Sequence, residues 1–323
     1  MILQLLITMA LSLVLINIYF LLAARFGIVD KPNIRSSHTQ LTLRGAGVIF
    51  PLVMLISWAT DASVKSEGFI SQLMDQPWVF GLVLISVVSF VDDIKPLSSR
   101  LRVFLHLTAV VASLISVDAP IGLMVIALVL IVGTINAYNF MDGINGITGL
   151  YSLVTLLGFY GLGELGVDIG MSQSFVLNVI AAVGVFLIYN LRKTAKCFCG
   201  DVGAVSMGFI LTYMVYRLVI GQMDPLYILM FGVYGTDAVG TIVLRIMRRE
   251  NIFEAHRTHY YQFLANEKKW PHVMVSILFA AMQLVLNYVI IHHHDVAYLL
   301  FVGMVLMYAG LRRADILNAW RTR

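Results

Sequence analysis

The stretch "PWVFGLVLISVVSFVDDIKP", residues 77–96, decides the fold. Residues 77–91 are mostly apolar, and they run directly into two adjacent acids, Asp92 and Asp93. An apolar run of this kind is typical of a short membrane-spanning helix. Carboxylates are unfavourable at the negative, C-terminal end of a helix, and two neighbouring carboxylates repel each other. A divalent cation such as Mg²⁺ would relieve both penalties, so we predict a functional site at this end of the segment.

Apolar segments recur along the whole chain. Of its 323 residues, 59% are apolar and only 12% are charged, whereas soluble domains carry about 25% charged residues. We therefore predict an all-α, polytopic integral membrane protein that forms a single domain over residues 1–323 and has about eleven transmembrane helices. The expected spans are about 2–24, 46–60, 77–91, 102–117, 120–138, 146–163, 174–190, 204–222, 225–245, 272–291 and 296–311.

The basic residues predict the orientation of these spans. If the N-terminus is outside, 20 of the 22 Lys and Arg residues fall in inside loops or in the C-terminal tail. Basic residues concentrate on the cytoplasmic side of membrane proteins. We therefore expect a periplasmic N-terminus, a cytoplasmic C-terminus and a functional site at the cytoplasmic face. The net charge of +4 reflects this asymmetry and does not indicate a nucleic-acid partner.

The loop "NAYNFMDGINGITG", residues 136–149, is unusually polar for the end of a span. Asn136, Asn139, Asp142 and Asn145 recur every three residues, so on one helix they would form a polar stripe. Such groups cost several kcal/mol (roughly) if they face lipid without hydrogen bonds. The stripe therefore predicts a cavity or a bound ligand.

The loop "RKTAKCFCGDVGAVSMGF", residues 192–209, places Asp201 at the start of a span, where helix N–H groups favour anions. Gly200 and Gly203 would allow a ligand to approach the backbone closely, and Phe198 could stack on a base. Two thiols one residue apart fall short of a closed zinc site, and no structural disulfide is expected.

Two further inside loops carry basic residues. The loop "DKPNIRSSHTQLTLRGAG", residues 30–47, contains Arg35, His38 and Arg44; it reads either as an ordinary basic loop or as part of the site. In "RRENIFEAHRTHYYQF", residues 248–263, the apolar residues suit a short interfacial helix. Its His256, Arg257 and His259 would either touch lipid phosphates or clamp a pyrophosphate.

These inside loops combine acids for Mg²⁺ with cations for phosphates, which is the usual equipment of phosphoryl transfer. At the membrane surface, such a site would meet a soluble nucleotide from one side and a lipid phosphate from the other. The alternative is a membrane transporter or lipid flippase with a cytoplasmic anion site. That class would need polar residues near the bilayer midplane, commonly in paired repeats, and no repeat is visible.

The ordered set "DKPNIRSSH", "VDDIK", "NAYNFMDGING", "FCGDVGA" and "ENIFEAHRTHYYQ" resembles the polyprenyl-phosphate N-acetylhexosamine-1-phosphate transferases, the MraY/WecA family. The resemblance covers about residues 25–265, and "EAHRTHYYQ" is closest to the branch that initiates O-antigen and capsule synthesis. It implies transfer of a sugar-1-phosphate from a UDP-N-acetylhexosamine to undecaprenyl phosphate, releasing UMP. It also implies Mg²⁺ or Mn²⁺ as cofactor, a bacterial inner-membrane location, a role in initiating cell-surface polysaccharide, and a homodimer.

The resemblance also implies roles for individual residues. Asp201 would be a direct metal ligand, with Asn139 helping, and Asp92 and Asp93 would lie beside the lipid phosphate, with either of them as its base. The nucleotide-sugar would be bound by Asn136, Asp142, Asn145, Phe198, His256, Arg257 and His259. Two positions depart from the family pattern, since Asn145 replaces an aspartate and Ala204 a serine. The sequence does not determine the donor sugar.

Overall fold

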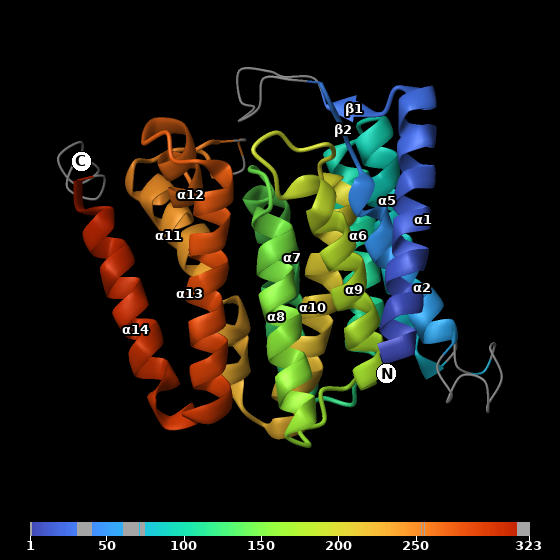
Figure 1. The fold of residues 1–323 in the computed structure, drawn as a ribbon. Coiled ribbons are helices and arrows are strands. Elements are labelled where there is room, and N and C mark those ends of the chain that lie inside the picture. The colour runs from blue at the N-terminus through green and yellow to red at the C-terminus, as the bar shows by residue number, and fades with distance from the viewer. Residues whose placement is uncertain are drawn as a thin grey trace.

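The computed structural model describes residues 2–30, 41–60, 71, 75–252, 254 and 256–314, and this part of the chain is a bundle of helices (Figure 1). The helices are α1 (Ile2–Phe26), α2 (Ile49–Ala59), α5 (Pro77–Ile94), α6 (Ser99–Leu114), α7 (Ile121–Met141), α8 (Ile147–Glu164), α9 (Gln173–Asn190), α10 (Gly200–Gln222), α11 (Gly232–Met247), α12 (Tyr260–Gln262), α13 (His272–His292) and α14 (His294–Leu311). Shorter turns are η1 (Ala46–Val48), η2 (Pro225–Phe231) and η3 (Phe263–Glu267), and β1 (Val29–Asp30) pairs with β2 (Thr42–Leu43).

The predicted all-α, polytopic fold is confirmed. Each of the eleven expected apolar segments coincides with helical structure. Within the described residues, eight helical segments are long and apolar enough to cross a membrane, while the helix over Ala46–Ala59 is shorter. The number of crossings therefore stays a prediction, as does their direction. Lys31, Arg35, His38 and Phe253 lie outside the described residues.

One expected span, residues 225–245, changes its helical geometry part-way. The 3-10 turn η2 ends at Phe231, α11 begins at the next residue, and together they form one helical segment over Pro225–Met247. Gln283 of α13 bonds both sides of this junction, because its amide donates to the Leu229 carbonyl at 3.0 Å and accepts from the Val233 N–H at 3.0 Å. Irregular backbone at membrane depth is tolerated where protein groups complete its hydrogen bonds. The buried Gln283 therefore accommodates the change from η2 to α11.

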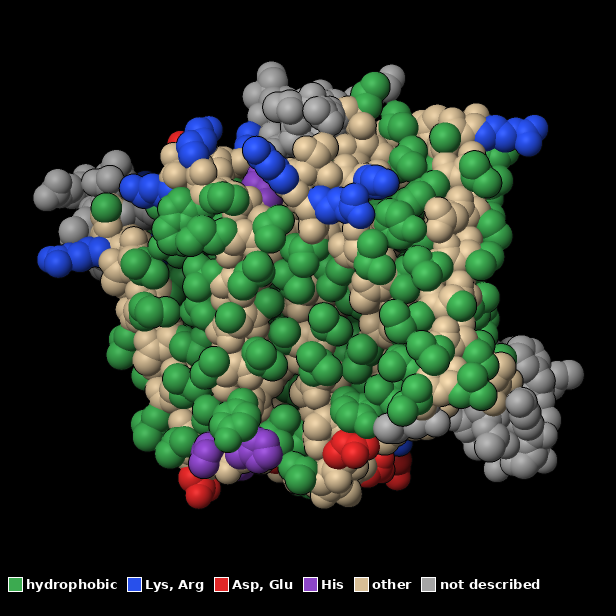
Figure 2. Space-filling model, viewed as in Figure 1, with side chains coloured by type: hydrophobic (Ala, Val, Ile, Leu, Met, Phe, Trp, Pro, Cys, Tyr) green, Lys and Arg blue, Asp and Glu red, His purple; other side chains and the backbone are tan. Residues whose placement is uncertain are grey.

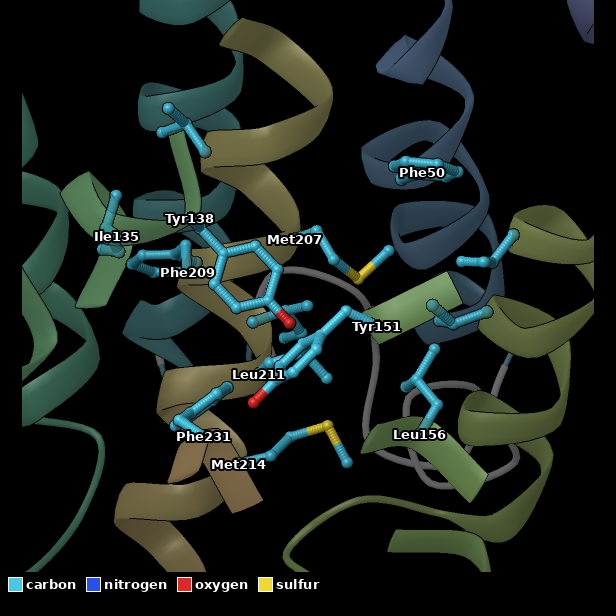
Figure 3. Close-up of a cluster of buried hydrophobic side chains, with 14 of the residues drawn as sticks. Phe50, Ile135, Tyr138, Tyr151, Leu156, Met207, Phe209, Leu211, Met214 and Phe231 are labelled. Carbon is cyan, nitrogen blue, oxygen red and sulfur yellow. The ribbon is translucent and has the colours of Figure 1, made fainter. Parts of the chain in front are cut away.

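Helix α10 runs through the centre of the bundle, and most of its side chains are buried. Figure 3 shows Met207, Leu211 and Met214 of this helix packed with Tyr138 of α7 and Tyr151 of α8. By contrast, α1 and α14 expose large apolar side chains, such as Leu21 (74%) and Leu299 (71%), as expected of lipid-facing helices. Because α10 is held on all sides, its first turn offers a rigid mount for functional side chains.

The ends of the bundle differ in charge. Helix α1 starts at the lower end of the view in Figure 1, and α14 finishes at the upper end. In Figure 2 the visible Lys and Arg side chains gather at the upper end, and the visible Asp, Glu and His side chains mostly at the lower end. This asymmetry agrees with the orientation predicted from the basic residues.

We predict that the upper end is cytoplasmic. Lys268→Cys, between η3 and α13, should react with a membrane-impermeant maleimide only after the cells are opened, whereas Leu165→Cys, after α8, should react in intact spheroplasts. The native Cys197 and Cys199 are buried, so background labelling should be low. Labelling of Lys268→Cys in intact spheroplasts would contradict the orientation.

Candidate active site

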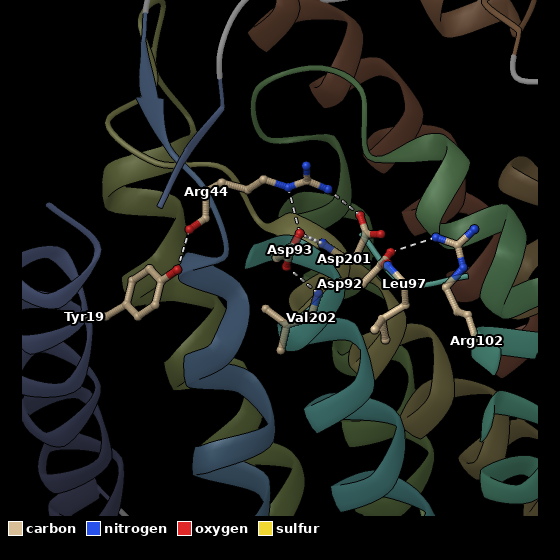
Figure 4. Close-up of polar contacts among 8 residues, drawn as sticks. All are labelled: Tyr19, Arg44, Asp92, Asp93, Leu97, Arg102, Asp201 and Val202. Carbon is tan, nitrogen blue, oxygen red and sulfur yellow. Dashed lines mark hydrogen bonds and ion pairs between the residues drawn. The ribbon is translucent and has the colours of Figure 1, made fainter. Parts of the chain in front are cut away.

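The two adjacent aspartates of α5 bind different partners (Figure 4). Asp92 accepts hydrogen bonds from the Leu97 N–H and from Arg102 Nη1, both at 2.7 Å. Asp93 turns the other way, toward Arg44 and the start of α10. The repulsion between neighbouring carboxylates is therefore relieved by two separate cations on opposite sides of α5.

Asp93 caps the N-terminus of α10. Its Oδ1 accepts the Asp201 N–H at 2.9 Å, its Oδ2 accepts the Val202 N–H at 3.0 Å, and its side chain is 0% exposed. The first N–H groups of a helix lack partners within the helix and carry partial positive charge. The sequence predicts an anion at this helix start, and one anion bound there is the protein's own Asp93.

Arg44 bridges Asp93 and Asp201. Its Nε lies 2.7 Å from Asp93 Oδ1, and its Nη2 lies 3.0 Å from Asp201 Oδ1. Burial by itself lowers the pKa of Arg44, but the neighbouring carboxylates Asp93 and Asp201 outweigh it and raise the pKa above its usual value. The guanidinium therefore stays charged. The Arg44 carbonyl accepts a hydrogen bond from Tyr19 of α1, so this link extends to the first helix.

Glycine is required where these elements meet. Gly200 has φ +74°, and a Cβ there would lie 2.6 Å from Asp93 Oδ2 and 2.6 Å from the Gly45 Cα. At Gly203, a Cβ would collide with the Gly47 backbone. The close backbone approach that these glycines allow is therefore used here by other parts of the same chain, and the predicted approach of a ligand stays a prediction.

Residues 43–46 and the loop over residues 192–209 are joined by backbone hydrogen bonds. Leu43 of β2 and Cys197 form a parallel bridge, the Phe198 N–H donates to the Leu43 carbonyl at 2.8 Å, and the Ala46 N–H donates to the Phe198 carbonyl at 3.0 Å. Phe198 is half-buried. Burial raises the pKa of Cys197 to about 12 and that of Cys199 well above its usual value, so both remain protonated thiols near neutral pH.

The predicted polar stripe over residues 136–145 is interrupted, because α7 ends at Met141. Asn136 is exposed and donates to the Val132 carbonyl of its own helix, and Asn139 is half-buried one turn later. Asp142 follows the helix and accepts from Thr148 Oγ1 at 2.6 Å. Removal of water by the surrounding protein raises the pKa of Asp142 to about 7. Its carboxyl is therefore partly protonated near neutral pH.

Asn145 is buried and holds two loops together. Its Nδ2 donates to the Arg192 carbonyl at 2.7 Å. Asn190, at the end of α9, supports the same junction, because it accepts the Gly146 N–H at 2.7 Å and donates to the Cys197 carbonyl at 2.8 Å. Sequence reasoning missed Asn190, although an amide in the last turn of an apolar span is a detectable signal.

In its described residues, the loop over residues 248–263 does not form the predicted interfacial helix before Tyr260. Among its described residues, helical structure begins only at Tyr260, and α12 spans three residues. The rings of His256 and His259 lie 4.9 Å apart. Burial, with help from His259 and Arg245, lowers the pKa of His256 to about 4, so His256 is neutral near pH 7. Arg257 in the same loop adds a guanidinium cation.

The acids at the α5–α10 junction, the polar loop after α7 and the histidine loop lie at the same end of the bundle (Figure 1). Tyr261 links two of them, because its hydroxyl donates to the Phe140 carbonyl at 2.9 Å and lies against Gly143. The charges of Asp93, Asp201 and Arg44 contribute to the shifted pKa of Asp142, so the acid cluster lies near the polar loop after α7. The fold thus brings the acids, amides and histidines from separate loops to one face.

The donor atoms fit a magnesium ion that is completed by a substrate. Asp201 is 23% exposed, lies beside Asp92 and bonds Arg44 through only one oxygen, so it still has coordinating capacity. Within the described residues, no group of three or more His, Cys, Asp or Glu side chains forms a ready metal cage. Mg²⁺ commonly binds one or two carboxylates together with substrate phosphates and water, which matches this arrangement.

We predict that Asp93→Asn destabilises the protein more than Asp92→Asn. The first change removes the charged partner of Arg44 Nε, leaves an N–H of α10 without its acceptor, and should cost about 2–4 kcal/mol. The second weakens a pair in which Arg102 is 39% exposed and should cost about 1 kcal/mol. Thermal unfolding in detergent measures both. Equal losses would contradict a special structural role for Asp93.

The sequence of the chain is similar to those of known proteins. The sequence model of Glycosyl transferase family 4 matches residues 76–219. This range contains Asp92, Asp93 and Asp201 and the polar loop after α7, while the histidine loop lies beyond it. The chain is also 24% identical over 262 residues to the probable undecaprenyl-phosphate N-acetylglucosaminyl 1-phosphate transferase of Bacillus subtilis (strain 168). That match covers 75% of this chain and 71% of the relative.

Proposed function

The chain belongs to the MraY/WecA-like family of polyprenyl-phosphate sugar-1-phosphate transferases, and from this premise we propose its reaction. It transfers an N-acetylhexosamine-1-phosphate, of the GlcNAc type or a deoxy derivative, from a UDP-sugar to undecaprenyl phosphate. The products are undecaprenyl-pyrophosphoryl-sugar and UMP. The observation that carries this proposal is the cluster of Asp92, Asp201 and Arg44 at the end of a lipid-facing helix bundle.

A long apolar groove supports a lipid acceptor. Helices α7, α10, α11 and α14 enclose a space of about 990 Å³ lined almost entirely by apolar side chains. On α7, the lining residues include Leu123, Leu130 and Thr134 and so run toward the helix end that carries Asn139 and Asp142. A polyprenyl chain in this groove would have its phosphate directed toward the polar end of the bundle.

In the proposed reaction, an oxygen of the lipid phosphate attacks the β-phosphorus of the UDP-sugar. The bond between this phosphorus and the bridging oxygen breaks, and UMP leaves with the electron pair. A lipid phosphate is already largely ionised near pH 7, since its second pKa is about 6. A base such as Asp92 therefore contributes little, and positioning and electrostatics dominate.

The residues of the chain divide this work. Asp201 and Asn139 would hold Mg²⁺, which when bound supplies positive charge against the donor pyrophosphate. Arg257 adds a fixed cation, and the neutral His256 offers a hydrogen bond to a phosphate or to the sugar. The half-buried Phe198 presents a ring beside the Asp201 loop for stacking on uracil.

The flippase or transporter alternative has less support. Its polar residues would have to serve a substrate near the bilayer midplane. Three buried polar side chains halfway along the bundle instead bond to one another, because Tyr151 donates to Gln283 at 2.6 Å and Gln283 donates to Asn287 at 2.7 Å. The Asn287 amide in turn donates to the Val154 carbonyl. A bacterial inner-membrane enzyme that begins surface polysaccharide synthesis is the favoured interpretation.

The test is UMP release by the purified protein in detergent with undecaprenyl phosphate and a panel of UDP-N-acetylhexosamines. UMP that forms only when lipid phosphate and Mg²⁺ or Mn²⁺ are both present would support the reaction, and the active donor would identify the sugar. Folded protein that releases no UMP with any donor would contradict the proposal and favour the transporter.

We predict that Asp201→Asn lowers the rate of UMP release at least about a hundredfold, because a neutral amide cannot hold the cation that stabilises the transition state. The protein should stay folded, since Asp201 is partly exposed and contributes to the α10 cap through its backbone N–H. Unfolding temperature and elution volume serve as controls. Wild-type turnover by this variant would refute the assignment of Asp201.

We predict that Gly235→Phe raises KM for undecaprenyl phosphate several-fold and leaves KM for the UDP-sugar unchanged. Gly235 lines the groove, and a Cβ there meets no atom within 4 Å, so the added ring would occupy lipid space. The matched control is Gly303→Phe on α14, where the space is equally open but the residue does not line the groove. Equal effects of the two substitutions would argue against the groove as the acceptor site.

A further inference from the structure

Asp237 is a buried acid that the proposed reaction does not use. It lies in α11, is 2% exposed and is the sole acidic side chain of that helix. A buried carboxylate is costly unless hydrogen bonds and charges compensate it. Its partners therefore indicate why an acid occupies this position.

Two of these partners are backbone groups of the histidine loop. The Tyr260 N–H donates to Asp237 Oδ1 at 2.8 Å, and the Tyr261 N–H donates to Oδ2 at 3.2 Å. The next contact is His259, whose Nδ1 lies 3.7 Å from Asp237 Oδ1. Each carboxylate oxygen thus receives one of two consecutive N–H groups. The amide of asparagine has a single acceptor oxygen and could satisfy only one of them.

Helix α14 supports the same loop from another side. The Tyr308 hydroxyl donates to Asp237 Oδ1 at 3.2 Å. One turn later, Arg312 Nη2 donates to the Thr258 carbonyl at 3.0 Å, and the Arg312 guanidinium lies 6.0 Å from the centre of the Tyr260 ring. Residues 258–261 are therefore held from α11 and from the C-terminal end of α14, and both helices lie outside the segment matched by the family model.

This support reaches the side chains assigned to the donor. Thr258 lies between Arg257 and His259, and its Oγ1 is 3.0 Å from His256 Nδ1. Fixing the backbone at residues 258–261 therefore fixes the buried His259 directly, holds His256 through Thr258, and restrains Arg257, which lies between these two histidines. A loop with an irregular backbone needs such anchors from other elements to hold a binding geometry.

We propose that Asp237 is a positioning residue for the nucleotide-sugar: together with Tyr308 of α14 and Arg312 just after this helix, it holds the loop that carries His256, Arg257 and His259 in its donor-binding conformation. This inference rests on the proposed transferase function for the identity of the donor. It assigns to α14 a role in donor binding, although this helix contributes no residue to the cluster of Asp92, Asp201 and Arg44.

The test compares Asp237→Asn with Asp224→Asn in the full chain. Asp224 is a matched control, because it also bonds a helix-start N–H, that of Leu226, and pairs with a histidine, His294, but lies at the opposite end of the η2–α11 segment. Amide hydrogen exchange at Tyr260 and Tyr261 reports on the anchor directly. Binding of UDP, measured by calorimetry, and KM for the UDP-sugar report on its consequence.

In Asp237→Asn we expect at least about tenfold faster exchange at residues 260–261, and about tenfold weaker UDP binding with a smaller change in kcat, since one or two hydrogen bonds to a charged group are lost. Asp224→Asn should leave both the exchange and UDP binding as in the wild type. Unchanged exchange in Asp237→Asn would overturn the proposal, as would faster exchange without weaker UDP binding.

A milder variant covers the case in which Asp237→Asn unfolds. Tyr308→Phe removes a single hydroxyl from the Asp237 cluster, and we expect a smaller change in the same direction at the same two amides. No local change in Tyr308→Phe would then overturn the proposal. Exchange and UDP binding require no turnover, so a failure of the transferase reaction itself would appear separately, as wild-type protein that binds UDP but releases no UMP.

Discussion

The structure depends on the burial of the Asp93 carboxylate at the start of α10. This group receives two backbone N–H groups and the guanidinium of Arg44, and its side chain has no exposed surface. A buried carboxylate is tolerated only when its charge and lone pairs are matched in this way. One side chain therefore ties together the end of α5, the start of α10 and the loop before α2.

This constraint separates the functions of two neighbouring acids. Asp93 is committed to the architecture, while Asp92, on the other side of α5, pairs with the partly exposed Arg102. Asp201 stands in the first turn of the helix that Asp93 caps, and its carboxylate is partly exposed. The buried helix α10 can thus present Asp201 to the substrate side because Asp93 caps its N-terminus.

The same design recurs at the histidine loop. Asp237 accepts the N–H groups of Tyr260 and Tyr261, as Asp93 accepts those of Asp201 and Val202. In each case a carboxylate buried in the bundle fixes consecutive backbone groups of a segment that carries predicted substrate ligands. The apolar groove bordered by α7 and α11 approaches the same end of the bundle, so both predicted substrates would be located by helices with ordered termini.

The sequence by itself determined the helical membrane fold, because apolar runs of spanning length and charge-poor composition follow from residue order alone. It also located Asp92, Asp93, Asp142 and Asp201 as the unusual polar residues of an apolar chain. Only the tertiary structure decided that the Asp93 side chain is buried and that the Asp201 side chain remains partly exposed. The bridging role of Arg44, the loop junction at Asn190 and the anchoring of residues 258–261 by α14 depend on contacts between segments distant in sequence. Such contacts arise from helix packing, and no local pattern encodes them.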